Sequence, residues 1–263
     1  MATNSPQTDC LTTCNAMARE QDFERWLAAL LAPPAARTDL SVILAFNAEV
    51  AKTRDVVSEP MLGQVRLQWW RETIEGAALG APRGHPVAEG LAAVLAQGRV
   101  KADDLRALID ARETDLTREG LNSLNDFLTY IDATAGALNR LLLACLGIEA
   151  AATQGAAHHA ARATAIAGQL RAAAVNAARG RVLLPRDVLT AQGVTVDALL
   201  AGRPQPGLAA AARELAEVAG REITAARTLR REVPAAALPV LASLRFADHH
   251  LARRDRDHLL SRA

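Results

Sequence analysis

The 263-residue chain has few aromatic residues, few cysteines and almost no net charge. Aromatic side chains make up 3% of it, and Ala and Leu supply most of an apolar fraction of 50%. Because aromatic and β-branched residues favour strands while Ala and Leu favour helices, this composition predicts an all-α fold. The 30 basic and 29 acidic residues leave a net charge of +1, so the composition gives no reason to expect a nucleic-acid partner.

Three cysteines are present, Cys10, Cys14 and Cys145. An odd number without a disulfide pattern is typical of a reducing compartment, and we therefore expect a cytoplasmic protein. The spacing of Cys10 and Cys14 occurs in some metal sites, but a structural zinc needs four ligands and no second pair accompanies them. Both fall in a polar stretch, residues 1–19, which we expect to be a flexible leader to a domain at residues 20–263.

Long hydrophobic runs are absent as well. The most apolar stretch, Leu138–Leu146, is interrupted by Asn139 and Arg140, and the N-terminus has no apolar signal core. We therefore expect no membrane-spanning segment. Basic groups such as Arg253-Arg254 leave room for peripheral contact with the anionic lipid of an inner membrane, although a solvated face is their commoner role.

Apolar residues recur at helical spacing through most of the chain. Prolines and glycines divide this pattern into helices, which we predict at residues 23–31, 37–53, 60–78, 86–97, 103–116, 123–146, 154–178, 187–192, 208–231 and 234–253. No linker separates two cores, and no fixed-period repeat occurs. The sequence therefore predicts one compact helical domain.

Four motifs follow one another in a recognisable order. They are Ile43–Asn47, Asp110–Leu116, Tyr130 with Thr134–Leu138, and Gly180–Asp187, which reads Gly-Arg-Val-Leu-Leu-Pro-Arg-Asp. Together they resemble the squalene/phytoene synthase family, and their order makes the resemblance far more specific than any one of them. The resemblance implies a single-domain, isoprenoid-synthase-like helical array around a central cavity.

Enzymes of that family hold magnesium between two aspartate-rich motifs, and the metal stabilises the departing diphosphate. Both motifs are degenerate here. The first reads Ala51-Lys52-Thr53-Arg54-Asp55, so that only Asp55 survives. In the second, Ala172 and Asn176 stand where aspartates are expected, and the family's Arg-Tyr pair aligns with Gly120-Leu121.

One carboxylate and one amide cannot hold three magnesium ions. The resemblance therefore implies a pseudoenzyme with no catalytic residue and no resident cofactor, which retains a cavity for an isoprenoid or another lipid. For Asp55 we expect a structural ion pair with Arg54 or Arg66.

A rival hypothesis keeps a prenyl transferase and displaces its acidic site. Asp110, Glu113 and Asp115 would then replace the lost carboxylates, with magnesium as cofactor and Asp55 and Asp115 as its first candidate ligands. The candidates for contact with a ligand or diphosphate are Asp55, Arg66, Asp110, Glu113, Asp115, Arg171, Arg179 and Arg181.

Three segments point to one branch of the family. Asp55–Pro60, Arg66–Arg71 and Ala177–Arg181 resemble the branch that contains the mitochondrial complex I assembly factor with a phytoene-synthase-like domain and its alpha-proteobacterial relatives. This resemblance implies a non-catalytic role and a protein partner in respiratory-complex assembly. A third hypothesis, a module that uses the helix carrying Trp69-Trp70 to dock a partner, is compatible with that role; we expect at least one of the two rings to be in the core.

Overall fold

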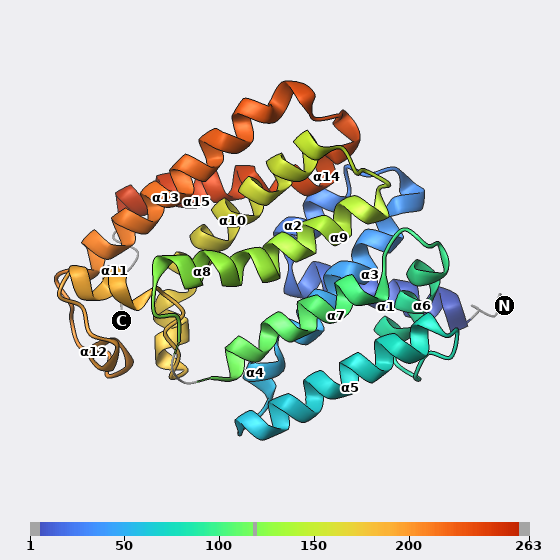
Figure 1. The fold of residues 1–263 in the computed structure, drawn as a ribbon, viewed down its shortest axis with the longest axis horizontal. Coiled ribbons are helices and arrows are strands. Elements are labelled where there is room, and N and C mark those ends of the chain that lie inside the picture. Colours follow the sequence, from blue (N-terminus) through green and yellow to red (C-terminus); the bar gives the residue numbers. More distant parts are fainter. Residues whose placement is uncertain (1–5, 118–119, 258–263) are drawn as a thin grey trace.

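A computed structural model describes residues 6–117 and 120–257, and this part of the chain contains helices and no strand (Figure 1). The α-helices are α1 (Pro6–Gln21), α2 (Phe23–Ala29), α3 (Pro34–Ala51), α4 (Thr53–Val56), α5 (Pro60–Ala78), α6 (Pro86–Ala96), α7 (Ala102–Ala111), α8 (Leu124–Ile131), α9 (Ala137–Cys145), α10 (Ala151–Ala178), α11 (Arg186–Ala191), α12 (Val196–Leu200), α13 (Leu208–Thr228), α14 (Leu238–Leu241) and α15 (Ser243–Asp257). Short 3₁₀ turns η1 (Arg112–Leu116), η3 (Leu229–Glu232) and η4 (Ala235–Ala237) and one π-helical turn, η2 (Asp132–Gly136), join some of them. The predicted all-α single domain is confirmed.

The N-terminal stretch corrects the sequence prediction. We expected a flexible leader over residues 1–19. Residues 1–5 lie outside the described part of the chain, but from Pro6 onward the stretch forms α1, which packs on α3 and α6. Cys10, Cys14 and Ala18 are buried, and the Cys14 thiol lies 3.6 Å from the carbonyl oxygen of Pro86. These small residues recur every four positions, which allows close helix packing without a strongly apolar pattern. Burial raises the pKa of the Cys14 thiol to about 12, so it is a neutral packing group.

Local signals place most other helix boundaries as predicted. α5 and α6 begin at Pro60 and Pro86, where a missing backbone N–H costs nothing. Ser123 caps α8 in a reciprocal capping box with Asp126. The helix predicted over residues 123–146 instead contains the π turn η2, and the one predicted to reach Leu116 ends in the 3₁₀ turn η1. The short α12 was not predicted.

Two buried clusters of apolar side chains form the core. One joins α1, α3, α5, α6, α7 and α9 and includes Phe46 and Trp70. The other joins α8, α10, α11 and α13 around Phe127 and Leu189. In Figure 1 the first half of the chain lies below and to the right of the second half, with α8 and α9 running between them. The residues discussed below come from both sides of this junction.

Membrane crossing requires a long apolar helix. None of the helices in residues 6–117 and 120–257 is both long enough and apolar enough for that.

Candidate functional site

A cavity of about 200 Å³ lies where the two core clusters meet. Its polar lining residues are Asp22, Glu24, Arg25, Asn47, Arg112, Tyr130, Thr134, Thr164, Gln169, Arg171 and His250. Its apolar lining comes from Ile131, Ala135, Leu138, Ala165, Gly168 and Ala247. The central cavity implied by the family resemblance is therefore present, but polar side chains dominate its wall.

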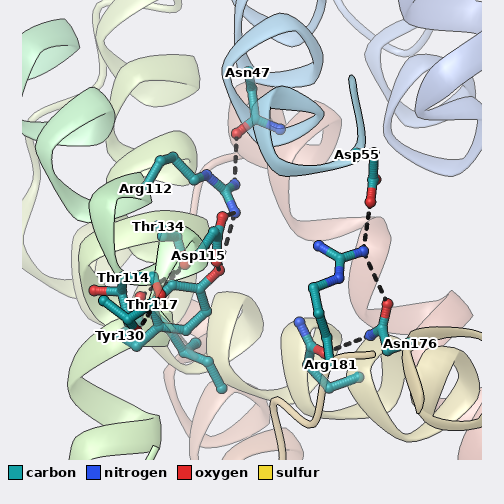
Figure 2. A network of polar contacts seen from close by, with 12 residues as sticks. Asn47, Asp55, Arg112, Thr114, Asp115, Thr117, Tyr130, Thr134, Asn176 and Arg181 are labelled. Atoms are coloured by element: carbon teal, nitrogen blue, oxygen red, sulfur yellow. Dashed lines mark hydrogen bonds and ion pairs between the residues drawn. The ribbon is translucent and has the colours of Figure 1, made fainter. Parts of the chain in front are cut away.

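A hydrogen-bonded network around Arg112 forms one side of the cavity (Figure 2). The Arg112 guanidinium donates to the Asn47 side-chain oxygen at 3.2 Å, to the Tyr130 hydroxyl at 3.1 Å and to an Asp115 carboxylate oxygen at 3.4 Å. Tyr130 in turn donates to the other Asp115 oxygen at 2.6 Å. The network joins α3, η1 and α8, which are distant in the sequence.

Burial sets the electrostatics of this network. The side chains of Arg112 and Asp115 are 14% and 8% exposed. Burial raises the pKa of the Tyr130 hydroxyl, and Arg112 opposes that rise only in part, so the hydroxyl is neutral and can donate to Asp115. Burial lowers the pKa of Arg112, whereas Tyr130 and Asp115 raise it, and the net direction is upward. Arg112 is therefore a charged, buried cation.

The remnants of the two aspartate-rich motifs meet at a second arginine (Figure 2). Arg181 lies 2.5 Å from the carboxylate of Asp55 and 3.5 Å from the side-chain oxygen of Asn176. Arg179 adds a longer ion pair to Asp55 at 3.7 Å. Asp55 is thus in a structural ion pair, as expected, but with Arg181 and Arg179 rather than with Arg54 or Arg66.

Lys52 of the first motif and Arg66 of α5 are both held by a carboxylate that we did not single out. Glu49 is buried in the last turn of α3, where it pairs with Lys52 at 2.5 Å and with Arg66 at 2.7 Å. A buried carboxylate needs such partners, because an unpaired charge inside a protein is strongly unfavourable. Arg66, a predicted ligand contact, is therefore engaged with Glu49.

These residues do not fit a magnesium cluster. At the motif positions Ala51 and Ala172 contribute methyl groups, and Asn176 contributes an amide whose oxygen accepts from Arg181. Asp55 contributes a single carboxylate that already faces two guanidinium groups. Within residues 6–117 and 120–257, no three His, Cys, Asp or Glu side chains gather as a metal ion would require.

The displaced acidic site of the rival hypothesis does not assemble. Asp110 and Glu113 both pair with Arg71 of α5, at 2.7 Å and 2.5 Å, and are about half exposed. Asp115 lies in the buried network with Arg112. The reason is the spacing: Asp110 and Glu113 are three positions apart and share one side, whereas Asp115 follows Glu113 by two positions and points away from it.

Arg171 of α10 lies at the rim of the cavity. Of the residues that we predicted to contact a ligand, it is the one that lines this cavity. Its guanidinium is 2.9 Å from Glu24 and 2.7 Å from the ring nitrogen Nε2 of His250. Burial raises the pKa of Glu24. The hydrogen bonds from His250 and Arg171 lower it by more than burial raises it, so the pKa of Glu24 is below its ordinary value. The rim is therefore an ionic cluster that links α2, α10 and α15.

The two tryptophan rings of the predicted docking helix, α5, both pack within the chain. Trp70 is fully buried against Phe46, as expected for at least one of the pair. Trp69 is half-buried and packs edge-on against His85, with the Arg83 guanidinium over its ring. Both rings thus have partners within the chain.

Sequence reasoning missed Glu49, Arg112 and the role of Tyr130. A signal existed for Glu49, because a lone carboxylate inside the apolar run Val42–Val50 must find a cation, and Lys52 follows three positions later. For Arg112 no local signal exists. Its partners Asn47 and Tyr130 are 65 and 18 residues away, so only the tertiary structure, which brings η1 to α3 and α8, reveals these contacts.

The comparisons with known proteins agree with this geometry. Residues 18–261 match the profile of the family described as Squalene/phytoene synthase. The Mus musculus protein "NADH dehydrogenase (ubiquinone) complex I, assembly factor 6" is 30% identical over 243 residues, which cover 92% of this chain and 73% of that protein. "Phytoene synthase 1, chloroplastic" of Arabidopsis thaliana is 26% identical over 196 residues, which cover 72% of this chain and 46% of that protein.

The fold has a close counterpart among solved structures. The crystal structure of squalene synthase HpnC from Alicyclobacillus acidocaldarius has a TM-score of 0.81 at 20% identity, covering 95% of this chain and 94% of that one. An isoprenoid-synthase-like helical array is therefore confirmed. Because the family profile spans all but the ends of the chain, and the fold and the motif order agree with it, the chain belongs to the squalene/phytoene synthase family.

Proposed function

We propose that this chain is a non-catalytic member of its family that supports the assembly of respiratory complex I. The observation that carries the first half of the proposal is the contact of Arg181 with Asp55 and Asn176. In a magnesium-dependent transferase, carboxylates from two helices face each other across bound metal. Here a guanidinium joins the two motifs directly, and a divalent cation would have to compete with Arg181 for a single carboxylate.

The second half of the proposal is supported by the relatives. The mouse protein is named as a complex I assembly factor, and its identity and coverage both exceed those of the Arabidopsis phytoene synthase. The name of the mouse relative is the basis of this half of the proposal, because a shared fold alone does not imply a shared function. The proposal includes a protein partner in complex I assembly and a peripheral position at the inner membrane.

An assembly protein needs a surface that binds a partner, and the start of α5 offers one. Val56, Met61, Leu62 and Val65 are exposed large apolar residues within ten positions, and Met61 is 74% exposed. Clusters of exposed apolar side chains are typical of protein interaction sites. We assign the contact with the complex I partner to this α4–α5 apolar face.

Deleting the gene in the organism that encodes the chain tests the assembly role. We expect membranes of the deletion strain to lose assembled complex I on native gels and to lose NADH oxidation coupled to quinone. The wild-type gene restores both, and so does Asp55→Ala, because the proposal gives that carboxylate no catalytic role. Unchanged complex I levels in the deletion strain would contradict the proposal.

The α4–α5 apolar face has a matched control at the C-terminal end of α5. We expect the double variant Met61→Asp/Val65→Asp to fold normally and to fail in restoring complex I. Leu79→Asp changes the apolar C-cap residue that follows α5, which is 80% exposed and lies outside this face, and it should restore complex I fully. Equal rescue by both variants would refute this assignment of the surface.

A direct enzyme assay tests the absence of catalysis. Purified protein incubated with farnesyl diphosphate and magnesium should release no diphosphate above the background, under conditions in which the Alicyclobacillus squalene synthase is active. Magnesium-dependent consumption of the substrate that disappears in Glu113→Ala, whose carboxylate is 46% exposed, would restore the rival hypothesis.

A further inference from the structure

One side of α2 carries a row of large apolar side chains that the chain leaves uncovered. Phe23, Leu27, Leu30 and Leu31 are each more than a third exposed, and Leu31 is 60% exposed. Their spacing places them on one side of the helix and of the turn that continues it. Leu238 of α14, which packs on α2, is also exposed. We call these five side chains the α2 apolar face.

The end of α2 and the turn into α3 lack polar side chains. From Trp26 to Ala36 no residue is charged, and the one polar side-chain group, the indole N–H of Trp26, donates to Asn15 at 2.9 Å. An interface with another protein ordinarily surrounds its apolar centre with a polar rim. This segment is apolar along its whole length, which suits contact with lipid better.

The backbone of the same turn suits a medium without water. The N–H groups of Leu30, Leu31 and Ala32 donate to carbonyl oxygens three positions earlier, at 3.3, 3.0 and 3.0 Å. Pro33 and Pro34 follow, and a proline has no N–H to satisfy. An unbonded backbone donor is costly in lipid. In these five residues each donor is bonded or absent, so the turn can enter the interface of a bilayer without that cost.

Two arginines without a carboxylate partner border the α2 apolar face. The Arg19 guanidinium lies over the Trp26 ring, 5.3 Å from its centre, and Arg37 donates from Nε to the Ala32 carbonyl oxygen at 2.8 Å. Both arginines are exposed, and no carboxylate of the described residues forms an ion pair with either. Cations beside an apolar helical face are typical of helices that lie on a membrane, where anionic headgroups supply the opposite charge.

We propose that the α2 apolar face enters the interfacial layer of a bilayer that contains anionic lipid, with Arg19 and Arg37 at the headgroups. The inference names the surface behind the peripheral position in the proposed function, and it rests on that position and not on the assembly role. A second copy of the chain is a poorer occupant, because a two-fold contact across this face would bring the unpaired arginines of both copies together. The α4–α5 apolar face is formed by other helices and is left to the protein partner.

Co-flotation of the purified whole chain with lipid vesicles tests the apolar part of the proposal. Vesicles of phosphatidylcholine alone are compared with vesicles of equal parts phosphatidylcholine and phosphatidylglycerol. The double variant Phe23→Ser/Leu31→Ser removes apolar area from the face, and Leu79→Ser/Leu200→Ser is its matched control, because both leucines are exposed elsewhere. We expect the wild type and the control to float with the anionic vesicles, and Phe23→Ser/Leu31→Ser to partition at least about tenfold more weakly.

Arg19→Gln/Arg37→Gln tests the charge and does not depend on how the serine variant folds. We expect its partitioning to anionic vesicles to fall roughly fivefold per arginine, with no change on phosphatidylcholine alone. Arg213→Gln/Arg221→Gln is the matched control, because both arginines are exposed on α13 and have no carboxylate partner among the described residues. Melting followed by circular dichroism checks that each variant keeps the Tm of the wild type.

The proposal is wrong if the wild type floats with neither kind of vesicle, or if Phe23→Ser/Leu31→Ser floats as well as the wild type. Dimers in lipid-free solution that this variant abolishes, measured by analytical ultracentrifugation, would make a second copy the occupant. Normal vesicle binding by the same variant together with loss of complex I rescue would make the occupant a protein. Unchanged complex I in the deletion strain, with vesicle binding intact, would refute the assembly role and leave this inference standing.

Discussion

Two arginine-centred clusters occur near the cavity, and they differ in the carboxylate that each arginine meets (Figure 2). Arg112 contacts Asp115, which is 8% exposed, together with Asn47 and Tyr130. Arg181 contacts Asp55, which is 36% exposed, and Asn176. The first cluster connects three helical elements below the surface, whereas the second bridges α4 and the loop after α10 at the surface.

The difference indicates which acidic positions this fold can lack. Asp55 is 36% exposed and the motif positions Ala51, Ala172 and Asn176 are partly exposed, where water screens charges and a substitution costs little stability. The Arg112 cluster lies behind them, where an unmatched charge is costly. Ala, Lys and Asn can therefore stand at the motif positions where the family has aspartate, and the fold is kept. We expect replacement of the buried Asp115 to destabilise the fold.

Asp115→Ala gives the largest expected effect. The substitution leaves the Arg112 cation buried without its carboxylate, which typically destabilises a protein by about 3–5 kcal/mol. The free energy of unfolding from urea titrations followed by circular dichroism measures this loss. Asp110→Ala is the control, because that carboxylate is 59% exposed and its loss should cost at most about 1 kcal/mol. Equal losses would erase the distinction between the clusters.

Much of the fold follows from local signals in the sequence. Pro60, Pro86 and the Ser123 cap give three helix starts, and the motif order gives the architecture. The departures are also physical. α1 buries Cys and Ala side chains that barely register as an apolar stripe, and the π turn η2 leaves no trace in the spacing of apolar residues.

The candidate site was predictable only where it depends on residue identity. The loss of carboxylates at Ala51, Ala172 and Asn176 is visible in the sequence and does not depend on the fold. The partners were not visible: Asp55 meets Arg181 across 126 residues, and Arg112 meets Asn47 across 65. The packing of the helices decides which residues form such pairs. From the sequence alone, a charged residue could pair with many different partners.

Tyr130→Phe sharpens the comparison with a smaller change. It leaves Asp115 without the 2.6 Å hydrogen bond and removes one acceptor from Arg112, while the ring still packs. Leaving buried polar groups unsatisfied in this way costs about 1–3 kcal/mol, which we expect in the same urea titration. A loss below about 0.5 kcal/mol would mean that water replaces the hydroxyl and that the cluster is less buried than its exposure indicates.

The single tyrosine also gives the buried cluster a titration of its own. Burial raises the pKa of Tyr130 in the folded protein, whereas the unfolded chain ionises near pH 10. The unfolded state therefore loses its proton first, so stability is constant with respect to this group below about pH 10 and falls as the pH rises above it. Ultraviolet absorbance of tyrosinate should appear together with unfolding. A native protein that ionises Tyr130 near pH 10 would contradict the assigned environment.

Arg181→Ala should have the smallest effect, and its dependence on salt decides the comparison. Surface ion pairs contribute up to about 1 kcal/mol, and at about 1 M salt the screening length falls to about 3 Å. We expect a loss of unfolding free energy of that size at low salt, which largely disappears at about 1 M sodium chloride, while Arg181→Lys retains part of the stability. The loss in Asp115→Ala should persist at both salt concentrations, because salt does not reach a buried pair. A salt-independent loss above about 2 kcal/mol in Arg181→Ala would contradict this expectation. The contact between the two motif remnants would then be part of the core, and the Arg181 guanidinium would join the helices that bound metal joins in the enzymes of the family.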